Sequence, residues 1–298
     1  MTIDKKYRYS FCILRFALCI FLFFPPWGGS RWLSLKEAIS GGFLGAGITF
    51  IRDEAGDSEF GITQMNISLS SSKHFDSYHL VSAGLQGGVA QRSVSPEKLQ
   101  WGSQWNGNRY DETIAPDEPL FSENFSFADF SGGLLWTFNN ERNTKVHAGI
   151  SALHLNRPKQ YFYTNYKNLY SKIVFLGSGE FLISGSRTSL LPSLLTVKEG
   201  PSKEIITGLM VRQNFAGGEG DEAGSETSVS GGIYSRLSDA FILAGQIQYR
   251  NFSFGIAYDV NVSGLSVASK GRGGLEIAIT YIPGAKSNRG EDVPRVKF

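Results

Sequence analysis

The stretch FSFGIAYDVNVSG, residues 252–264, alternates between apolar and small or polar side chains along almost its whole length. Such alternation is typical of a β-strand whose two faces meet different environments. In a soluble β-sandwich the apolar row would point into a core, whereas in a membrane barrel it would face lipid and the polar row would face the lumen. The apolar row is Phe252, Phe254, Ile256, Tyr258, Val260 and Val262, and the other row is Ser253, Gly255, Ala257, Asp259, Asn261 and Ser263.

The composition favours strands and excludes several classes of protein. The net charge is +2 and the positive residues are scattered, which gives a nucleic-acid partner no electrostatic support. The 35 glycines and 22 phenylalanines suit short strands, tight turns and aromatic girdles better than helices. The only cysteines, Cys12 and Cys19, lie in the first segment, so the body of the chain has none for a disulfide framework or a metal site.

Residues 1–42 are expected to form a signal-like or atypical leader segment. Three basic residues precede an apolar stretch at 11–24 that is interrupted only by Arg15, and this order resembles the charged and hydrophobic regions of a secretory signal. An uncleaved anchor and a truncated start remain open as alternatives. No later stretch reaches the roughly 20 apolar residues of a membrane helix. If the chain lies in a membrane, it therefore spans it as strands.

The alternating pattern of the opening stretch recurs along the chain. Most of the candidate strands are near the roughly 9 to 11 residues that a tilted strand needs to cross a bilayer. Short polar turns separate them, and no helical period of ten to fifteen residues lies between them, which argues against a parallel α/β sheet. The twelve candidates are 43–52, 60–70, 77–91, 126–138, 145–155, 171–186, 189–198, 203–213, 228–236, 240–249, the opening stretch and 272–282.

The chemistry of the two faces favours lipid on the outside. The polar face of the candidate strands is rich in Gly, Ser, Gln and charge, whereas a soluble barrel is normally filled by large side chains. Aromatic residues lie on the apolar face or near strand ends. We therefore expect an all-β fold: a single antiparallel transmembrane β-barrel of about 12–14 strands over residues 43–282, followed by a tail at 283–298. A pair of large secreted β-sandwiches remains the alternative.

The number of strands determines on which side of the membrane each connection lies. If both ends of the barrel are periplasmic, the long connections 92–125 and 156–170 lie outside the cell. The same count sends the acidic, glycine-rich connection 214–227 to the periplasm.

Several segments resemble the PorP/SprF family of outer-membrane proteins, which is associated with type IX secretion and gliding motility. The resemblance covers roughly residues 43 to 282 and implies an outer-membrane location, contacts with type IX secretion components and with secreted cargo proteins, and a role in secretion or surface attachment. The matching segments keep the family order: GAGITFIRDEAG (45–56), YHLVSAGLQGGVAQRSVSPEKLQW (78–101), GISALHLNRP (149–158), GGIYSRLSDAFILAG (231–245), FGIAYDVNVSGL (254–265) and GGLEIAITY (273–281).

These segments supply the candidate site residues. His154 belongs to the HLNRP motif at a strand end, where capping the rim and binding a partner are both open, and Asp259 and Asn261 are expected to face the lumen in a hydrogen-bond network. The last strand also resembles a barrel-assembly signal, with a glycine followed by alternate apolar residues. The candidate rim or lumen residues are His154, Arg157, Pro158, Tyr234, Arg236, Tyr258, Asp259, Asn261 and Ser263, and the candidate assembly signal is Gly274, Ile277, Ile279 and Tyr281.

An enzymatic function has little support in the sequence. The chain has four histidines, and no HExxH, GxSxG or paired-cysteine spacing occurs. His147 alternates with apolar neighbours and is expected to face the lumen. We expect no catalytic residue, cofactor or metal, and a non-enzymatic component of the secretion or gliding machinery. A passive outer-membrane pore and a surface adhesin barrel remain alternatives.

Overall fold

The computed structural model describes residues 31–36, 42–56, 59–95, 99–115, 117, 124–140, 144–160, 167–215, 227–264 and 272–281. Apart from one 3-10 turn, η2 (Gly102–Gln104), every regular element among them is a strand. The strands are β1 (Arg31–Lys36), β2 (Gly42–Ala55), β3 (Phe60–His74), β4 (His79–Ser93), β5 (Asn124–Asn139), β6 (Thr144–Leu153), β7 (Lys159–Gln160), β8 (Lys167–Asn168), β9 (Lys172–Leu182), β10 (Thr188–Glu199), β11 (Ser202–Phe215), β12 (Thr227–Arg236), β13 (Ala240–Tyr249), β14 (Phe252–Asn261) and β15 (Arg272–Tyr281).

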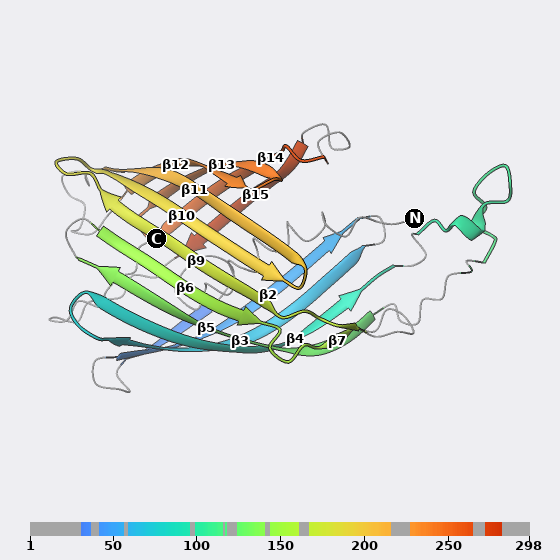
Figure 1. Cartoon of the computed structure of the whole chain (residues 1–298), viewed down its shortest axis with the longest axis horizontal. Helices are drawn as coiled ribbons and strands as arrows, with labels where there is room; N and C mark the ends of the chain where they lie inside the picture. Colours follow the sequence, from blue (N-terminus) through green and yellow to red (C-terminus); the bar gives the residue numbers. More distant parts are fainter. Residues whose placement is uncertain are drawn as a thin grey trace.

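Thirteen of these strands form one antiparallel sheet in which each strand pairs with the next along the sheet in chain order. The sheet curves so that β12–β15 lie across from β2–β5 (Figure 1). The two remaining strands, β7 and β8, pair with each other in the connection between β6 and β9. The fold is the expected single antiparallel β-barrel, and the strand number lies within the expected range.

The two faces of the wall are inverted relative to a soluble protein. Ile256 on β14 is 54% exposed, whereas its neighbour Ser253 on the opposite face is 6% exposed. The same division runs through the sheet, where the exposed large side chains are mostly apolar and many buried side chains are Ser, Thr, Gln, Asn or charged. An apolar outside and a polar inside are typical of a barrel that is surrounded by lipid.

Alternating antiparallel strands sort the connections into two groups. The connections β2–β3, β4–β5, β6–β9, β10–β11, β12–β13 and β14–β15 lie at one end of the barrel, which we name the loop end. The others lie at the opposite end, which we name the turn end. The turn end carries a row of exposed aromatic side chains, in which Tyr249 is opposite Phe252 and Phe252 is opposite Tyr281. Such a row matches the aromatic girdle at a membrane interface.

The sheet begins earlier than the sequence patterns predicted. β1 lies within the segment 1–42 that we expected to be a leader, yet it pairs with β2 from Arg31 opposite Ile48 to Lys36 opposite Phe43. The segment RWLSLK is short and follows a long apolar run, so its alternation is hidden in the sequence. Residues 1–30 and the expected tail at 283–298 lie outside the described residues.

Strand lengths also differ from the expectation on one side of the barrel. β2, β3, β4 and β5 contain 14, 15, 15 and 16 residues, whereas β12 to β15 contain 10 each. Since roughly 9 to 11 residues cross a bilayer, the longer strands extend beyond its hydrocarbon layer. In the part of the chain that the structure describes, no helix is long and apolar enough to cross a membrane.

Candidate functional site

The HLNRP motif ends β6 at the loop end of the barrel. His154 has a positive φ of 54°, which turns the chain after Leu153. Leu155 N–H donates to the Phe130 carbonyl at 2.9 Å. The Asn156 side chain then replaces the main chain in pairing with β5. Its amide donates to the Ala128 carbonyl at 2.7 Å, and its oxygen accepts from Phe130 N–H at 3.3 Å. The motif therefore fastens the end of β6 to β5 through a side chain.

The His154 side chain is buried inside the barrel wall and contacts a polar group of three further residues. Its Nδ1 lies 2.9 Å from Oδ1 of Asp129 on β5. The Gln64 amide on β3 donates to Asn66 at 3.0 Å and, at 3.5 Å, to the second oxygen of Asp129. This group links β3, β5 and the end of β6 across β4, and we name it the histidine cluster.

The two residues that follow Asn156 in the motif shape the connection to β9. Arg157 is exposed, has a positive φ of 45°, and donates its N–H to the His154 carbonyl at 2.9 Å. Pro158 is buried, and its carbonyl accepts from Leu169 N–H at 2.8 Å. The β6–β9 connection is thus held against the barrel on both sides of the β7–β8 pair.

A second polar group surrounds the buried guanidinium of Arg236 at the end of β12. Its Nη2 donates to Asp259 on β14 at 2.8 Å, and its Nη1 donates to Asp239 in the β12–β13 turn at 3.1 Å. Its Nε lies 3.3 Å from Oε1 of Glu204 on β11. We name this group the arginine cluster. It joins β11, β12, the β12–β13 turn and β14 at the loop end.

The arginine cluster depends on a small residue between its partners. Arg236 is opposite Ala240 on β13, and Ala240 is opposite Asn261 on β14. The short Ala240 side chain leaves the guanidinium free to reach Asp259 across β13. Because buried charges lose their hydration, they stay buried only when they are paired and hydrogen-bonded.

Tyr234 faces the same interior from the middle of the wall. It is opposite Gly208 on β11, and a Cβ added at Gly208 would collide with the Tyr234 ring. The Tyr234 hydroxyl is hydrogen-bonded to Ser193 on β10. The glycine therefore provides the space in which the ring lies flat against the wall.

The remaining candidates of the opening stretch occupy different places. Tyr258 lies on the outer face near the loop end and does not line the lumen. Asn261 ends β14 and is half-buried, on the same side as Asp259. Ser263 is just beyond the strand, where its N–H donates to the Asp239 carbonyl at 3.1 Å. Of these three, Ser263 is tied to the arginine cluster through the main chain of Asp239.

Several residues of these clusters were not among the sequence candidates. Asp129 and Glu204 lie in strands that carried no quoted motif, and Lys172 forms a further buried ion pair with Glu199 at 2.9 Å. Charged residues at inward positions of an alternating strand are the signal that could have identified them. Their partners depend on which strands are neighbours, and a single sequence does not state this.

The last strand contains the candidate assembly signal. Ile277, Ile279 and Tyr281 are exposed on the outer face. Gly273, one residue before the candidate Gly274, is closely packed, because a Cβ at Gly273 would collide with the Asp259 carbonyl. The register of β14 and β15 shifts between Tyr258 and Val260, so an irregularity lies beside the arginine cluster.

Three charged side chains on the inner face of the barrel are buried. Arg212 on β11 and Arg236 on β12 are each 5% exposed, and Lys172 is 6% exposed. Arg212 is paired with Glu180 on β9 at 3.0 Å. Long side chains on the wall of a wide, water-filled channel would remain exposed. These three side chains therefore lie within polar contacts of the inner face and do not project into open solvent.

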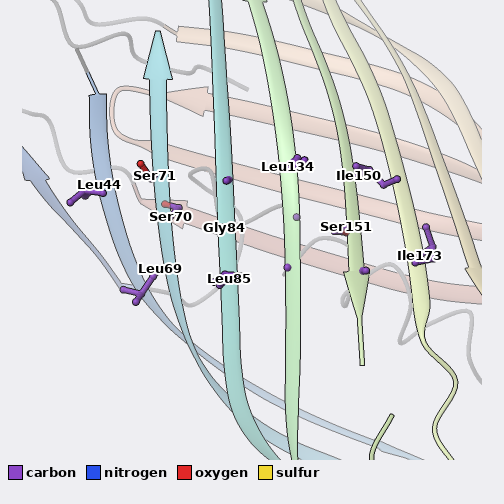
Figure 2. Close-up of a pocket in the computed structure, with 14 residues that line it drawn as sticks. Leu44, Leu69, Ser70, Ser71, Gly84, Leu85, Leu134, Ile150, Ser151 and Ile173 are labelled. Atoms are coloured by element: carbon purple, nitrogen blue, oxygen red, sulfur yellow. The ribbon is translucent and has the colours of Figure 1, made fainter. Parts of the chain in front are cut away.

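A hollow of about 800 Å³ lies in the outer face across β2–β6 and β9 (Figure 2). It forms where small residues interrupt the bulky apolar rows. Ser71 is opposite Ala83, and beside them Leu85 is opposite Gly132. Its lining is almost entirely apolar, so the hollow belongs to the lipid-facing side of the wall.

No group of three or more His, Cys, Asp or Glu side chains that could hold a metal ion occurs among the described residues. The His154 and Arg236 groups each contain polar side chains from several strands, and their contacts are ion pairs and hydrogen bonds within the wall. These contacts hold neighbouring strands together at the loop end of the barrel.

A comparison with protein families agrees with a wall that is apolar outside and polar inside. The model of the family described as "Type IX secretion system membrane protein PorP/SprF" matches residues 31–281. The chain belongs to the PorP/SprF family. The match begins at the first residue of β1 and ends at the last residue of β15. A PorP/SprF chain is a membrane protein of the type IX secretion system, and this strand-built wall lies in the outer membrane.

This PorP/SprF chain is similar to solved structures. Among them is the crystal structure of a Pseudomonas aeruginosa FadL homologue, with 9% sequence identity and a TM-score of 0.38, and the similarity covers 84% of this chain and 74% of that chain. No curated protein matches the sequence.

Proposed function

We propose that this PorP/SprF protein is a non-enzymatic component of the type IX secretion apparatus that supports the secretion or the surface attachment of specific cargo proteins. The coarser part, membership of a type IX secretion membrane-protein family, is given by the match over residues 31–281. The proposal adds the role toward cargo and, by the same resemblance, a contribution to gliding motility.

The observation that carries the proposal is the set of buried ion pairs on the inner face. Lys172, Arg212 and Arg236 point inward and are buried in ion pairs, which supports a closed scaffold more than a passive pore. A solute pore needs a hydrated path along its axis. A barrel whose interior is tied together by ion pairs presents its loops and its outer wall to partners instead.

The lengths of the connections support one orientation. Bacterial barrels carry short periplasmic turns and longer extracellular loops. The two longest expected loops, 92–125 and 156–170, both lie at the loop end. In the proposed orientation the loop end faces the outside and is available to surface cargo, while the turn end faces the periplasmic parts of the machinery.

The proposal includes no catalytic step. The buried contact of His154 with Asp129 lies in the strand-fastening motif. The Ser171 hydroxyl beside it donates to the main-chain carbonyl of His154 at 3.3 Å. These contacts support a structural role for the histidine.

Deletion of the gene tests the proposal. The secreted and surface proteomes of deletion and parent cells would be compared, together with the uptake of small hydrophilic solutes. We expect a specific subset of proteins to disappear from the cell exterior and to accumulate inside, with unchanged solute uptake. Slower uptake with normal secretion would support a passive pore, and normal secretion with lost surface adhesion would support an adhesin.

A further inference from the structure

The connection between β4 and β5 contains a folded loop at residues 99–115, which we name the aromatic loop. Its centre is Gln104, which is buried although it lies in a connection. The Gln104 amide donates to the Ile114 carbonyl at 3.0 Å, and its oxygen accepts from Trp101 N–H at 3.1 Å. Asp111 N–H donates to the Gln104 carbonyl at 2.9 Å. These contacts hold the two halves of the loop together without help from the barrel.

The aromatic loop ends in a small hairpin that presents an aromatic face. Trp105 and Tyr110 are bridged as an antiparallel pair, which places their side chains on the same side. The turn between them is fixed by Asn106, whose side-chain oxygen accepts from Asn108 N–H at 3.1 Å and from Arg109 N–H at 3.0 Å. The Trp105 ring is nevertheless 58% exposed. A fixed loop that exposes a tryptophan has the makeup of a binding surface, because interface hot spots are enriched in Trp, Tyr and Arg.

The position of this loop separates it from the membrane. Figure 1 shows η2 and its flanking chain, in teal, beyond the ends of the strands at the loop end of the barrel. The aromatic loop therefore lies beyond the wall that contacts lipid. The aromatic girdles of the barrel are made by residues on the strands themselves.

The charge around Trp105 argues against an anionic membrane surface as its partner. The loop and the adjoining Asp117 carry three carboxylates, on Asp111, Glu112 and Asp117, and a single guanidinium on Arg109. The hydrogen bonds from Thr113 to Asp111 lower the pKa of that carboxyl, so it stays ionised in mildly acid medium. Carboxylates repel anionic lipid headgroups and attract a basic partner.

We propose that the aromatic loop is a docking surface for a secreted cargo protein, in which Trp105 inserts into an apolar pocket with a basic rim. This inference rests on the proposed function and on the orientation in which the loop end faces the outside. The occupant is a protein because the exposed aromatic ring and the acidic border fit a pocket of that kind and oppose anionic lipid.

The test uses the full-length barrel in detergent and the purified cargo protein whose export is lost in the deletion strain. Trp105→Ala should weaken cargo binding about tenfold or more, which is the loss typical of a hot-spot truncation. The matched control is Phe75→Ala, because Phe75 is 72% exposed and lies in the β3–β4 turn at the opposite end. The control should bind cargo as the unaltered protein does. Binding should also weaken as salt rises, since the loop is acidic.

Each other result overturns the inference. Equal cargo binding by the two variants would show that Trp105 is not a docking residue. Unchanged cargo binding with reduced binding of anionic vesicles, or of purified surface polysaccharide, would assign the loop to lipid or to sugar. If gene deletion leaves secretion intact, the proposed function fails; if deletion abolishes secretion but Trp105→Ala binds cargo normally, the docking surface alone fails.

Discussion

Arg236 on β12 donates to Asp259 on β14 at 2.8 Å, across the intervening strand β13. Arg236 is opposite Ala240 on β13, and this short side chain leaves room for the guanidinium to cross that strand. Two further carboxylates, on Asp239 and Glu204, lie around the same guanidinium. One buried cation therefore holds the ends of β11, β12 and β14 and the β12–β13 turn together at the loop end.

Arg236→Met should destabilise the barrel strongly. It leaves three carboxylates without their cation in the wall, and removing one partner of a buried ion pair costs about 3–5 kcal/mol. The free energy of unfolding would be measured by urea titration of barrels refolded into lipid vesicles. The control is Arg187→Met, since Arg187 is exposed in the β9–β10 turn and its loss should change stability little.

A double-mutant cycle with Asp259→Asn separates the ion pair from simple loss of packing. If the pair is coupled, the double variant should be more stable than the sum of the two single losses predicts, by about 0.5–3 kcal/mol. Additive losses would mean that Arg236 acts through its other partners.

The architecture could be predicted from the sequence because it follows from one pattern, the alternation of apolar and polar residues along each strand. Strict alternation, as in residues 252–264, identifies strands and their two faces, and the exposed Ile256 beside the buried Asp259 follows that pattern. β1 was missed because six residues are too few for the pattern to stand out beside an apolar run.

The contacts of the candidate site could not be predicted in the same way. Arg236 and Asp259 were both singled out, but their pairing depends on the register of three strands. His154 was placed at the rim, yet its partner Asp129 lies 25 residues earlier in the chain. The close contact of Gly273 with the Asp259 carbonyl lies beside a shift in strand register, and alternation alone does not reveal such a shift.

Ile256→Arg should test the assignment of the lipid-facing row. Ile256 is exposed on the outer face of β14, and an arginine facing lipid near the midplane costs about 2–4 kcal/mol. Ala257→Ser on the inner face should cost little. The yield of folded barrel after refolding into lipid would be measured for both. Equal yields would show that the faces are wrongly assigned.

Gly273→Ala should disturb the junction of β14 and β15. The added Cβ collides with the main-chain carbonyl of Asp259, and backbone cannot move aside as a flexible side chain can. We expect a loss of about 1–3 kcal/mol, as for other overpacked sites. Gly231→Ala is the matched control because a Cβ there meets no atom within 4 Å. Thermal unfolding followed by heat-modifiable gel migration would compare the two, and identical midpoints would refute the constraint.

The stability of the β3–β4 turn should decrease at acid pH because of Asp76. Its carboxylate accepts from the N–H groups of Tyr78 at 2.8 Å and His79 at 2.7 Å, and these bonds lower its pKa below the ordinary value, the Tyr78 bond most. A lowered folded pKa adds stability that is complete above the ordinary pKa of an aspartate and is lost as pH falls through the folded value. The protection factors of the Tyr78 and His79 amides, corrected for the intrinsic exchange rate at each pH, should therefore fall in acid, and Asp76→Ala should lower them already at neutral pH. Protection factors of the native protein that stay constant as pH falls would contradict this.

Replacing Ile277 and Ile279 together with Asn should test the last strand and, through it, the secretion role. Both side chains are exposed on the outer face of β15, where amides would meet lipid and the expected assembly signal would lose its apolar row. Outer-membrane levels of the protein should fall, whereas Ala278→Ser on the inner face should leave them unchanged. If the barrel serves secretion, a specific subset of surface cargo should then be lost from the exterior while small-solute uptake barely changes. Normal surface cargo in cells that demonstrably lack the barrel would refute the secretion role and leave the fold intact.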